Sequence, residues 1–471
     1  MNDFINTAVN SFTSFLAQYK SSLKESKSSN PVVSFALKID EIDFSGKIDY
    51  LIKYYEKSFY FEKPDENFSF LGVDEIISIT ENGDKRFAAT DKKIKELKQS
   101  FINNWDTISL KNKPLFVGGM KFSVEHPDDD WKDFNDSIWS VPELLILRNK
   151  EDFFIFFNFI YNNTLSEANL IEKFKSKLEN IIKPQEDKKS EDIKIHKLDG
   201  NSPKDKKKWK NLVNSCLDNI FSSKVEKIVI SRKIEMLLSR ELNLNHVINH
   251  FKENYPECYL FIFHRGKSSF LGATPERLVK FCEGTLKIEA LAGSASRGKT
   301  EEEDLLLEKN LLNNEKDIKE HDYVVDHIED SISGQVEDFT IEKKHSIKKL
   351  NNIQHISTFI TAKMNSNNTP MNIIKELFPT PAVCGFPKEV SLNLIKKLEN
   401  HYRGLYSGII GWFNFNDEGE FAVAIRSALT YGNKLIAFAG CGIVEKSDPD
   451  LEYEETELKF KPILSVFNEN Q

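Results

Sequence analysis

One stretch near the C-terminal end decides the fold: FAVAIRSALTYGNKLIAFAGCGIVEKSDPDLEYEETELKFK, residues 421–461. Its first ten residues, Phe421 to Thr430, alternate in a way that predicts one strand, with Arg426 projecting from a face of small side chains. A forked guanidinium on such a floor suits a planar anion such as a carboxylate. A structural ion pair between Arg426 and a neighbouring strand is the alternative interpretation.

The next part of the stretch predicts a hairpin turn and a returning strand. Gly432 and Asn433 form the turn, and the strand runs on to Ala439. Gly440 and Gly442 are then expected to break the strand. Paired glycines let a ligand approach backbone N–H groups closely.

A helix follows, with Ser447 as its expected N-cap and Pro449 in its first turn. Glu452, Glu455 and Lys459 fall at i, i+3 and i+7, which places them along one helix face. Such a face either binds a hard cation or forms a solvated surface of ion pairs. Together with the arginine and the glycines, it predicts the wall of a pocket for a charged small molecule.

The composition indicates a soluble globular protein of 471 residues, 40% hydrophobic and 29% charged. A formal net charge of −9 disfavours binding to nucleic acid or to an anionic membrane, because both need a basic surface. The five cysteines form no CxxC pair, so neither a disulfide framework nor a zinc site is expected. No signal peptide or bilayer-spanning run is apparent, and we expect a cytoplasmic protein.

The chain is expected to form one structural domain with two regions. Residues 1–204 are a divergent N-terminal half with an opening helix over 1–30 and short Phe-rich strands. Residues 205–465 alternate helices and strands more regularly and include a long helix over 301–333. The charged segment 185–208 is expected to be a linker or an exposed crossover.

An acidic group is expected around Glu320. It continues the line of Val324 and Ile328 in an apolar helix stripe, where a charge is costly unless it is paired or binds a metal. A glutamate at the edge of the stripe that reaches solvent is the alternative. If Glu320 meets Glu452 and Glu455 in space, carboxylates without His or Cys would select a hard cation, foremost Mg²⁺.

Two further residues are candidates for proton transfer. Lys227 opens the strand KIVISR and could act as a base, although lysines at strand edges usually reach solvent. Glu276 follows a Gly-Ala-Thr-Pro turn that could aim it into a cleft as a general acid; a turn-capping or ion-paired glutamate is the alternative. No GxGxxG, Walker A, HExxH or GxSxG pattern is present, so nucleotide-binding and hydrolase interpretations have no support.

The motifs of the second half resemble, in this order, those of the chorismate-utilising enzymes, and among them the isochorismate synthases. The resemblance covers roughly residues 50–465, with weaker N-terminal matches. The motifs are KIVISR (227–232), FLGATPERL (270–278), IEALAGSASRG (288–298), KDIKEHDYVVD (316–326), QHI (354–356), FPTPAVCGFPK (378–388), YRGLYSGIIGW (402–412), FAVAIRSAL (421–429) and AGCGIVEKSDPDLEYEETELK (439–459).

The resemblance implies an α/β (α+β) fold: a single large chorismate-binding domain with extended, mostly antiparallel sheets in two similar halves and outer helices. It further implies that Lys227 activates water for attack at C2 of chorismate, and that Glu276 protonates the departing C4 hydroxyl. Mg²⁺ would be held by Glu320 and Glu455, with Glu452 beside them. The implied substrate-binding residues are Gly293, His355, Ala382, Val383, Tyr406, Arg426, Gly440 and Lys459.

The sister enzymes differ in their nucleophiles. Anthranilate synthase lacks the lysine at the position of Lys227, and aminodeoxychorismate synthase has a lysine where this chain has Ala292. Water is therefore the expected nucleophile, no amidotransferase subunit is expected, and a monomer is the default. A salicylate synthase and a non-catalytic chorismate-binding protein remain alternatives. The sequence leaves open whether the product would serve menaquinone or siderophore synthesis.

Overall fold

The computed structural model describes residues 2–25, 30–42, 44–108, 110–124, 129–162, 165–183, 193–351 and 353–467.

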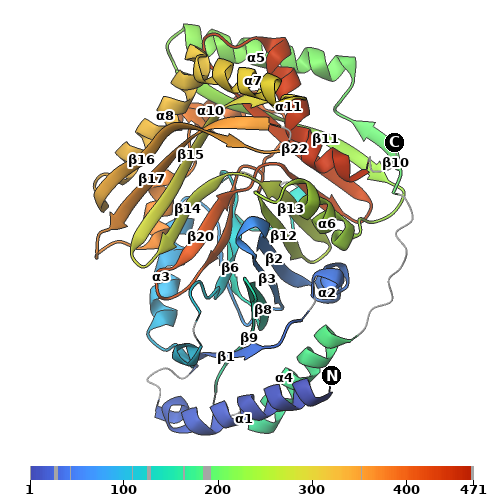
Figure 1. Ribbon diagram of the computed structural model, residues 1–471, viewed down its shortest axis with the longest axis vertical. Coiled ribbons are helices and arrows are strands. Elements are labelled where there is room, and N and C mark those ends of the chain that lie inside the picture. The colour runs from blue at the N-terminus through green and yellow to red at the C-terminus, as the bar shows by residue number, and fades with distance from the viewer. Residues whose placement is uncertain are drawn as a thin grey trace.

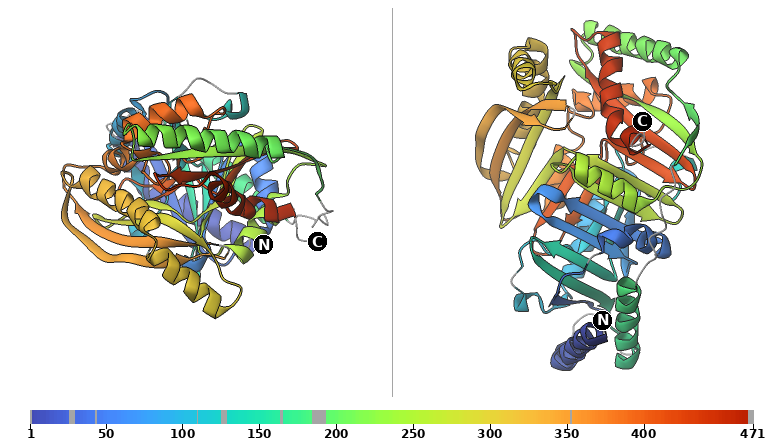
Figure 2. Two further views of the ribbon diagram at one scale, coloured as in Figure 1. Left: turned by 90° about the horizontal axis from the view of Figure 1, so that it is seen from above. Right: turned by 45° about the vertical axis from the view of Figure 1, so that its right-hand side comes forward.

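Two large sheets, A and B, form the frame of the molecule (Figures 1 and 2). Sheet A has 13 strands, which lie in the order β10 (Ile195–Asp199), β11 (Lys227–Leu238), β22 (Lys434–Ile443), β21 (Ser427–Tyr431), β13 (Ser268–Thr274), β12 (Tyr259–Arg265), β2 (Lys57–Lys63), β3 (Phe68–Val73), β8 (Leu144–Asn149), β9 (Asp152–Ile160), β1 (Val32–Ile39) and β5 (Ile102–Asn103), with β18 (Gly385–Phe386) beside β11. Sheet B has nine strands, in the order β16 (Val336–Lys349), β17 (Ile353–Met364), β15 (Thr285–Ser296), β14 (Arg277–Cys282), β20 (Gly419–Val423), β19 (Ile409–Phe413), β6 (Phe116–Met120), β7 (Ser137–Val141) and β4 (Ile77–Glu81).

Helices lie around the sheets. They are α1 (Asn2–Glu25), α2 (Ile48–Tyr54), α3 (Arg86–Lys98), α4 (Glu167–Ile182), α5 (Pro203–Phe221), α6 (Leu244–Asn254), α7 (Glu301–Leu312), α8 (Glu315–Ile332), α9 (Pro370–Leu377), α10 (Lys388–Leu398) and α11 (Pro449–Leu464). Helices α1 and α4 lie at one end of the molecule, and α5 and α11 lie at the other (Figure 1). No helix among the described residues is both long enough and apolar enough to cross a membrane.

Each sheet joins strands from both halves of the chain. In sheet A, β2 pairs with β12 antiparallel, and in sheet B, β6 pairs with β19 antiparallel. The border between residues 204 and 205 falls inside α5. The predicted class, α/β with extended and mostly antiparallel sheets and outer helices in a single domain-like fold, is confirmed.

Aromatic side chains fill the space between the sheets. Phe61 and Phe70 of sheet A are completely buried, and Phe68 contacts the ring of Trp412 in sheet B with 5.8 Å between ring centroids. A second core lies on the other face of sheet A, where Phe12 of α1 packs against several neighbouring rings. Sheet A is therefore buried on both faces, which explains the continuous runs of Phe in its strands.

The expected single strand over residues 421–430 is wrong. The chain forms β20 in sheet B, leaves it after Val423, and re-enters sheet A as β21 at Ser427. Arg426 sits at the crossing with a φ of 51°, a left-handed conformation that is uncommon outside glycine. The prediction failed because strict alternation does not reveal where a strand changes sheets.

Three other local predictions also change. Strand β22 runs through Gly440 and Gly442 without a break, because both pair with β11. The N-cap of α11 is Asp448, whose side chain accepts from the backbone N–H groups of residues 450 and 451, and not Ser447. The helix over 301–333 is two helices, because Asn314 caps a new start.

The expected linker is partly structured. Residues 195–199 form the edge strand β10, and α5 begins at Pro203 with a capping box between Ser202 and Asp205. Residues 185–192 lie outside the described residues.

We predict that Phe61→Ala lowers the free energy of unfolding by about 3–5 kcal/mol, because it opens a cavity in the strand pair that joins the two halves. Urea unfolding followed by fluorescence measures the change. Phe221→Ala is the control, since that ring is 63% exposed, and it should change stability by less than about 0.5 kcal/mol. Equal effects of the two variants would contradict the assignment of the core.

Candidate active site

A cavity lies where the two sheets part. Most of the residues expected to bind substrate or transfer protons line it together: Glu276, Gly293, Glu320, His355, Ala382, Val383, Tyr406, Arg426, Gly440 and Lys459. Lys227 lies against this cavity through its contact with Glu320, and Glu455 pairs with Lys459 of the lining. Glu452, one turn before Glu455 on α11, pairs with Lys316, which lies one turn before Glu320 on α8. The structure therefore brings the thirteen residues into one neighbourhood, although they span more than 230 positions.

Two chain crossings between the sheets supply the acid and the guanidinium. The chain passes from β13 in sheet A to β14 in sheet B at Glu276, and from β20 back to β21 at Arg426. The crossings are tied to each other: Val423 N–H donates to Glu276 O at 3.0 Å, and Ala273 N–H donates to Arg426 O at 3.1 Å. The side chains at both crossings are thus fixed at the mouth between the sheets.

Lys227 is completely buried, so the alternative of a strand-edge lysine in solvent is wrong. Its Nζ lies 2.9 Å from Glu320 Oε1, in an ion pair rather than an aligned hydrogen bond, and among the described residues Nζ has no hydrogen-bond acceptor. Gly442 makes room for this pair, because a Cβ there would lie 2.6 Å from Glu320 Oε1 and 2.8 Å from Lys227 Cε. The buried ammonium can therefore still bind a water or substrate oxygen.

Glu276 is 7% exposed, and its pKa is raised to about 7. Burial is the largest cause, and it is partly offset by the positive charges of Lys227, Lys459 and Arg426. A carboxyl group with such a pKa is partly protonated near neutral pH. Glu276 can therefore donate a proton where an ordinary glutamate could not.

Arg426 is 4% exposed, and burial lowers its pKa. Within the described part of the chain, no carboxylate lies within ion-pair distance of its guanidinium. The predicted alternative, a structural ion pair, is therefore not present among those residues. An anionic group entering the cavity would find an arginine whose forked donors are not already taken by an acid.

The predicted acidic group lies at the contact of α8 and α11. Glu452 is 1% exposed; its Oε1 accepts from Lys316 Nζ at 2.8 Å, and its Oε2 has no hydrogen-bond partner among the described residues. Burial, followed by the charge of Glu455, raises the pKa of Glu452. Lys459 Nζ lies 2.6 Å from Glu455 and donates to Gly440 O at 3.0 Å.

The pKa of Glu320 shifts in the opposite direction from those of Glu452 and Asp317. Burial alone would raise its pKa, but Lys227 and Lys316 outweigh burial and lower it. Asp317 was missed by the sequence analysis; burial, followed by the charge of Glu320, raises the pKa of Asp317 to about 7. Its spacing of three residues before Glu320 on one helix is the signal that could have identified it.

The carboxylates at the contact of α8 and α11 have the right chemistry to bind a hard cation, but they are not already arranged around a single point. The acidic group offers carboxylate oxygens, and Glu452 Oε2 is buried without a partner among the described residues. Among the described residues, no three His, Cys, Asp or Glu side chains are already grouped so as to hold a metal ion. Lysines neutralise the carboxylates in this arrangement instead.

His355 presents a hydrogen-bond acceptor to the cavity. Its Nδ1 lies 3.3 Å from Gly293 O and 2.9 Å from Ser294 Oγ, and a carbonyl oxygen can only accept, so Nδ1 carries the hydrogen. The Nε2 atom is buried and has no partner among the described residues. Burial, aided by Arg426 and Lys459, holds the pKa of His355 far below its usual range, so the ring is neutral.

Small residues and one ring complete the walls. The Tyr406 ring stacks on Phe438 with 5.1 Å between centroids, and its hydroxyl would lie 3.1 Å from a Cβ added at Gly440. Gly293 has a φ of 75°, which favours glycine. Ala382 and Val383 lie on the loop before β18. Small and aromatic residues therefore line the cavity beside its charged groups.

The raised pKa of Glu276 predicts a pH-dependent cost to stability. The folded protein binds the Glu276 proton more tightly than the unfolded chain, whose glutamate has the usual value of 4.5. The wild type therefore loses stability as pH rises from 4.5 to about 7, and the loss persists above that. Glu276→Gln lacks this loss and should gain up to about 3 kcal/mol relative to wild type between about pH 5 and 8.

Urea unfolding at several pH values measures this difference. Glu445→Gln, which changes an exposed carboxylate, serves as the control and should stay within about 0.5 kcal/mol of wild type throughout. A pH-independent difference for Glu276→Gln would contradict the raised pKa.

Comparison with known proteins identifies relatives of this chain. The family described as chorismate binding enzyme matches residues 15–468. Isochorismate synthase MenF of Bacillus subtilis (strain 168) is 28% identical over 442 residues, which are 92% of this chain and 93% of that protein. The salicylate biosynthesis isochorismate synthase of Pseudomonas aeruginosa is 29% identical over 416 residues, 87% of this chain and 84% of that protein.

Solved structures share the fold. The structure of MenF, the menaquinone-specific isochorismate synthase from Escherichia coli, matches with a TM-score of 0.77 and 19% identity, covering 97% of this chain and all of that one. At this identity the likeness shows the fold alone. Because the family match spans nearly the whole sequence, this chain belongs to the chorismate-binding enzyme family.

Proposed function

We propose that this protein is an isochorismate synthase, an isomerase that converts chorismate to isochorismate by adding water at C2 and losing the C4 hydroxyl. The observation that carries the proposal is the placing of a buried amine, Lys227, and a buried acid with a pKa of about 7, Glu276, at one cavity with Arg426. The relatives named above as isochorismate synthases, which align over most of their length, support it.

The two proton carriers have opposite tasks. Lys227 acts as the neutral amine, after the proton that it carries in the ion pair with Glu320 has left, and accepts a proton from the water that attacks C2. Glu276 acts as the neutral acid and gives a proton to the C4 oxygen, which leaves as water. As water adds to C2, the C1=C2 double bond moves to C1=C6, the C5=C6 double bond moves to C4=C5, and the C4–O bond breaks. One water enters and one leaves, so the product is an isomer of the substrate. Burial of both groups keeps other water from competing with this exchange.

The remaining residues orient the ring. Arg426 binds a carboxylate of the substrate, with Lys459 and Tyr406 nearby, and the backbone at Gly440 allows close approach. His355 Nε2, as an acceptor, receives a hydrogen bond from a ring hydroxyl. Gly293, Ala382 and Val383 contact the ring faces.

We propose Mg²⁺ as the cofactor, held by Glu320 and Glu455 with Glu452 beside them. The orphaned Glu452 Oε2 and the all-oxygen donor set support this choice. The bound ion would supply positive charge for the ring carboxylate. Lys227, Lys316 and Lys459, which now neutralise these acids, would give up part of that role to the ion.

We also propose the partners, the oligomeric state and the compartment of the enzyme. Water as nucleophile requires no amidotransferase subunit, and Ala292 stands where a nucleophilic lysine would be needed for amination. We propose a cytoplasmic monomer.

Chorismate incubated with the purified protein and Mg²⁺ should give isochorismate as the main product on chromatography. Lys227→Ala and Glu276→Gln should each lower kcat by about 10²–10⁴-fold, because each removes one proton carrier. Lys446→Ala, at a lysine whose side chain is 68% exposed, should keep wild-type activity. Salicylate with pyruvate as main products would favour a salicylate synthase, and binding of chorismate without turnover would favour a non-catalytic protein.

Removal of metal should abolish activity. Protein treated with EDTA and passed into metal-free buffer should be inactive with chorismate, and added Mg²⁺ should restore it. Glu455→Gln should raise the Mg²⁺ concentration needed for half-maximal activity by about tenfold or more, since one carboxylate ligand is lost. Glu445→Gln, an exposed acid on the loop before α11, is the control. Full activity in EDTA would refute the cofactor.

A further inference from the structure

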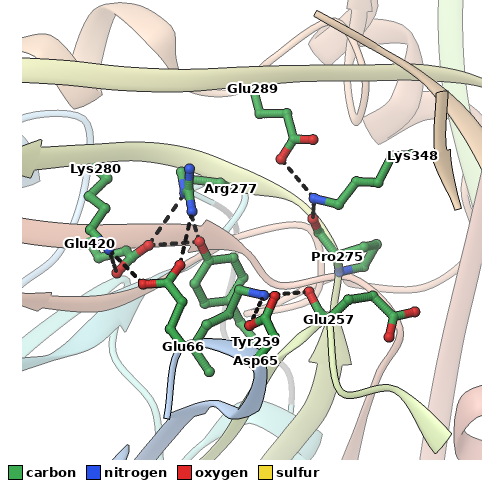
Figure 3. A network of polar contacts seen from close by, with 11 residues as sticks. Asp65, Glu66, Glu257, Tyr259, Pro275, Arg277, Lys280, Glu289, Lys348 and Glu420 are labelled. Atoms are coloured by element: carbon green, nitrogen blue, oxygen red, sulfur yellow. Dashed lines mark hydrogen bonds and ion pairs between the residues drawn. The ribbon is translucent and has the colours of Figure 1, made fainter. Parts of the chain in front are cut away.

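The segment that carries Glu276 is held on both sides by polar side chains (Figure 3). On one side, Arg277 Nε donates to the Tyr259 hydroxyl at 2.7 Å, and that hydroxyl donates to Glu420 at 2.7 Å. On the other side, Lys348 Nζ donates to the carbonyl oxygen of Pro275 at 3.2 Å. Glu276 therefore lies between two anchored neighbours.

Lys348 is itself fixed by sheet B. Its Nζ lies 2.7 Å from Oε2 of Glu289, and Ser357 Oγ donates to the other oxygen of that carboxylate at 3.0 Å. Glu289 is 5% exposed, whereas the Lys348 side chain keeps about a fifth of its exposed area. Three adjacent strands, β15, β17 and β16, thus hold one ammonium against the backbone of the acid's own loop.

The same ammonium acts on Glu276 through space. The charged groups that face this carboxyl are Lys227 of β11, Lys459 of α11, Arg426 of the β20–β21 crossing and Lys348 of β16, and all four oppose the effect of burial on its pKa. Neutral His355 and Tyr406 line the same cavity. Of the four cations, Lys348 and Lys227 are not among the residues that line the cavity, and Lys348, unlike Lys227 and Lys459, has no ion pair with Glu320, Glu452 or Glu455 among the described residues.

We propose that Lys348, held by Glu289, is a positioning residue for Glu276: it anchors the carbonyl group of Pro275 and supplies a fixed positive charge behind the acid. This inference rests on the proposed function, because it gives Glu276 the role of general acid. Lys348 acts through Glu276 and touches neither the substrate nor the reacting atoms.

The pH profile separates this role from a merely structural ion pair. The acid must be protonated to act, so kcat falls as pH rises through its pKa. Removing the Lys348 charge favours the protonated form and raises that pKa. In Lys348→Gln and Lys348→Met, the fall of kcat at high pH, the basic limb of the pH profile, should therefore shift to higher pH by about half a unit or more.

The kinetic constants add a second readout. We expect both variants to lower kcat by about tenfold, because the acid loses its anchor, with KM for chorismate changed by less than about threefold. Lys348→Arg keeps a charge and a donor and should restore the wild-type limb. Lys343→Gln changes an exposed lysine on the same strand and should leave both kcat and the limb unchanged.

The outcomes distinguish the proposed isochorismate synthase function from the positioning role of Lys348. A wild-type protein that forms no isochorismate refutes the proposed function. An active wild type, with a basic limb that stays in place in whichever of Lys348→Gln and Lys348→Met folds, refutes the role of Lys348. A limb that moves in these variants and returns in Lys348→Arg supports it. Thermal unfolding and circular dichroism identify the folded variants.

Discussion

The burial of Lys227 against Glu320 is the interaction on which the rest of the site depends. A lysine with no exposed surface is costly in a protein interior unless an acid compensates it, and Glu320 lies 2.9 Å away. The pair has room only because Gly442, on the neighbouring strand β22, has no side chain to fill the space. One absent Cβ thus permits a charged amine beside the cavity between the two sheets.

Burial and neighbouring charges together set the behaviour of the acids around the cavity. Four cations face Glu276, yet burial still keeps its pKa near 7. At the contact of α8 and α11, Glu452 keeps one oxygen without a hydrogen-bond partner among the described residues. An acid able to give up a proton and an acidic group able to bind a cation therefore lie in one neighbourhood. This combination suits a substrate that carries both a leaving hydroxyl and carboxylates.

The backbone architecture explains why these groups hold their places. Glu276 and Arg426 each sit where the chain passes from one sheet to the other, and the two crossings are hydrogen-bonded to one another. The regular ladder ends at such a point, so side chains there point into the gap between the sheets instead of into either core. Behind Glu276, Lys348 and Arg277 tie the crossing to sheet B and to the Tyr259–Glu420 pair.

The sequence by itself determined the class of the fold, most of the helices and strands, and, through motif resemblance, all thirteen candidate residues of the site. Local signals sufficed for these, since periodicity, capping residues and motif order are properties of neighbouring positions. Only the tertiary structure decided that residues 421–430 change sheets at Arg426, that Lys227 is buried and that Lys348 lies against Pro275. Pairs such as Lys348 and Glu289 are 59 residues apart and meet across sheet B, so their contact depends on strand order and register, which no local pattern encodes.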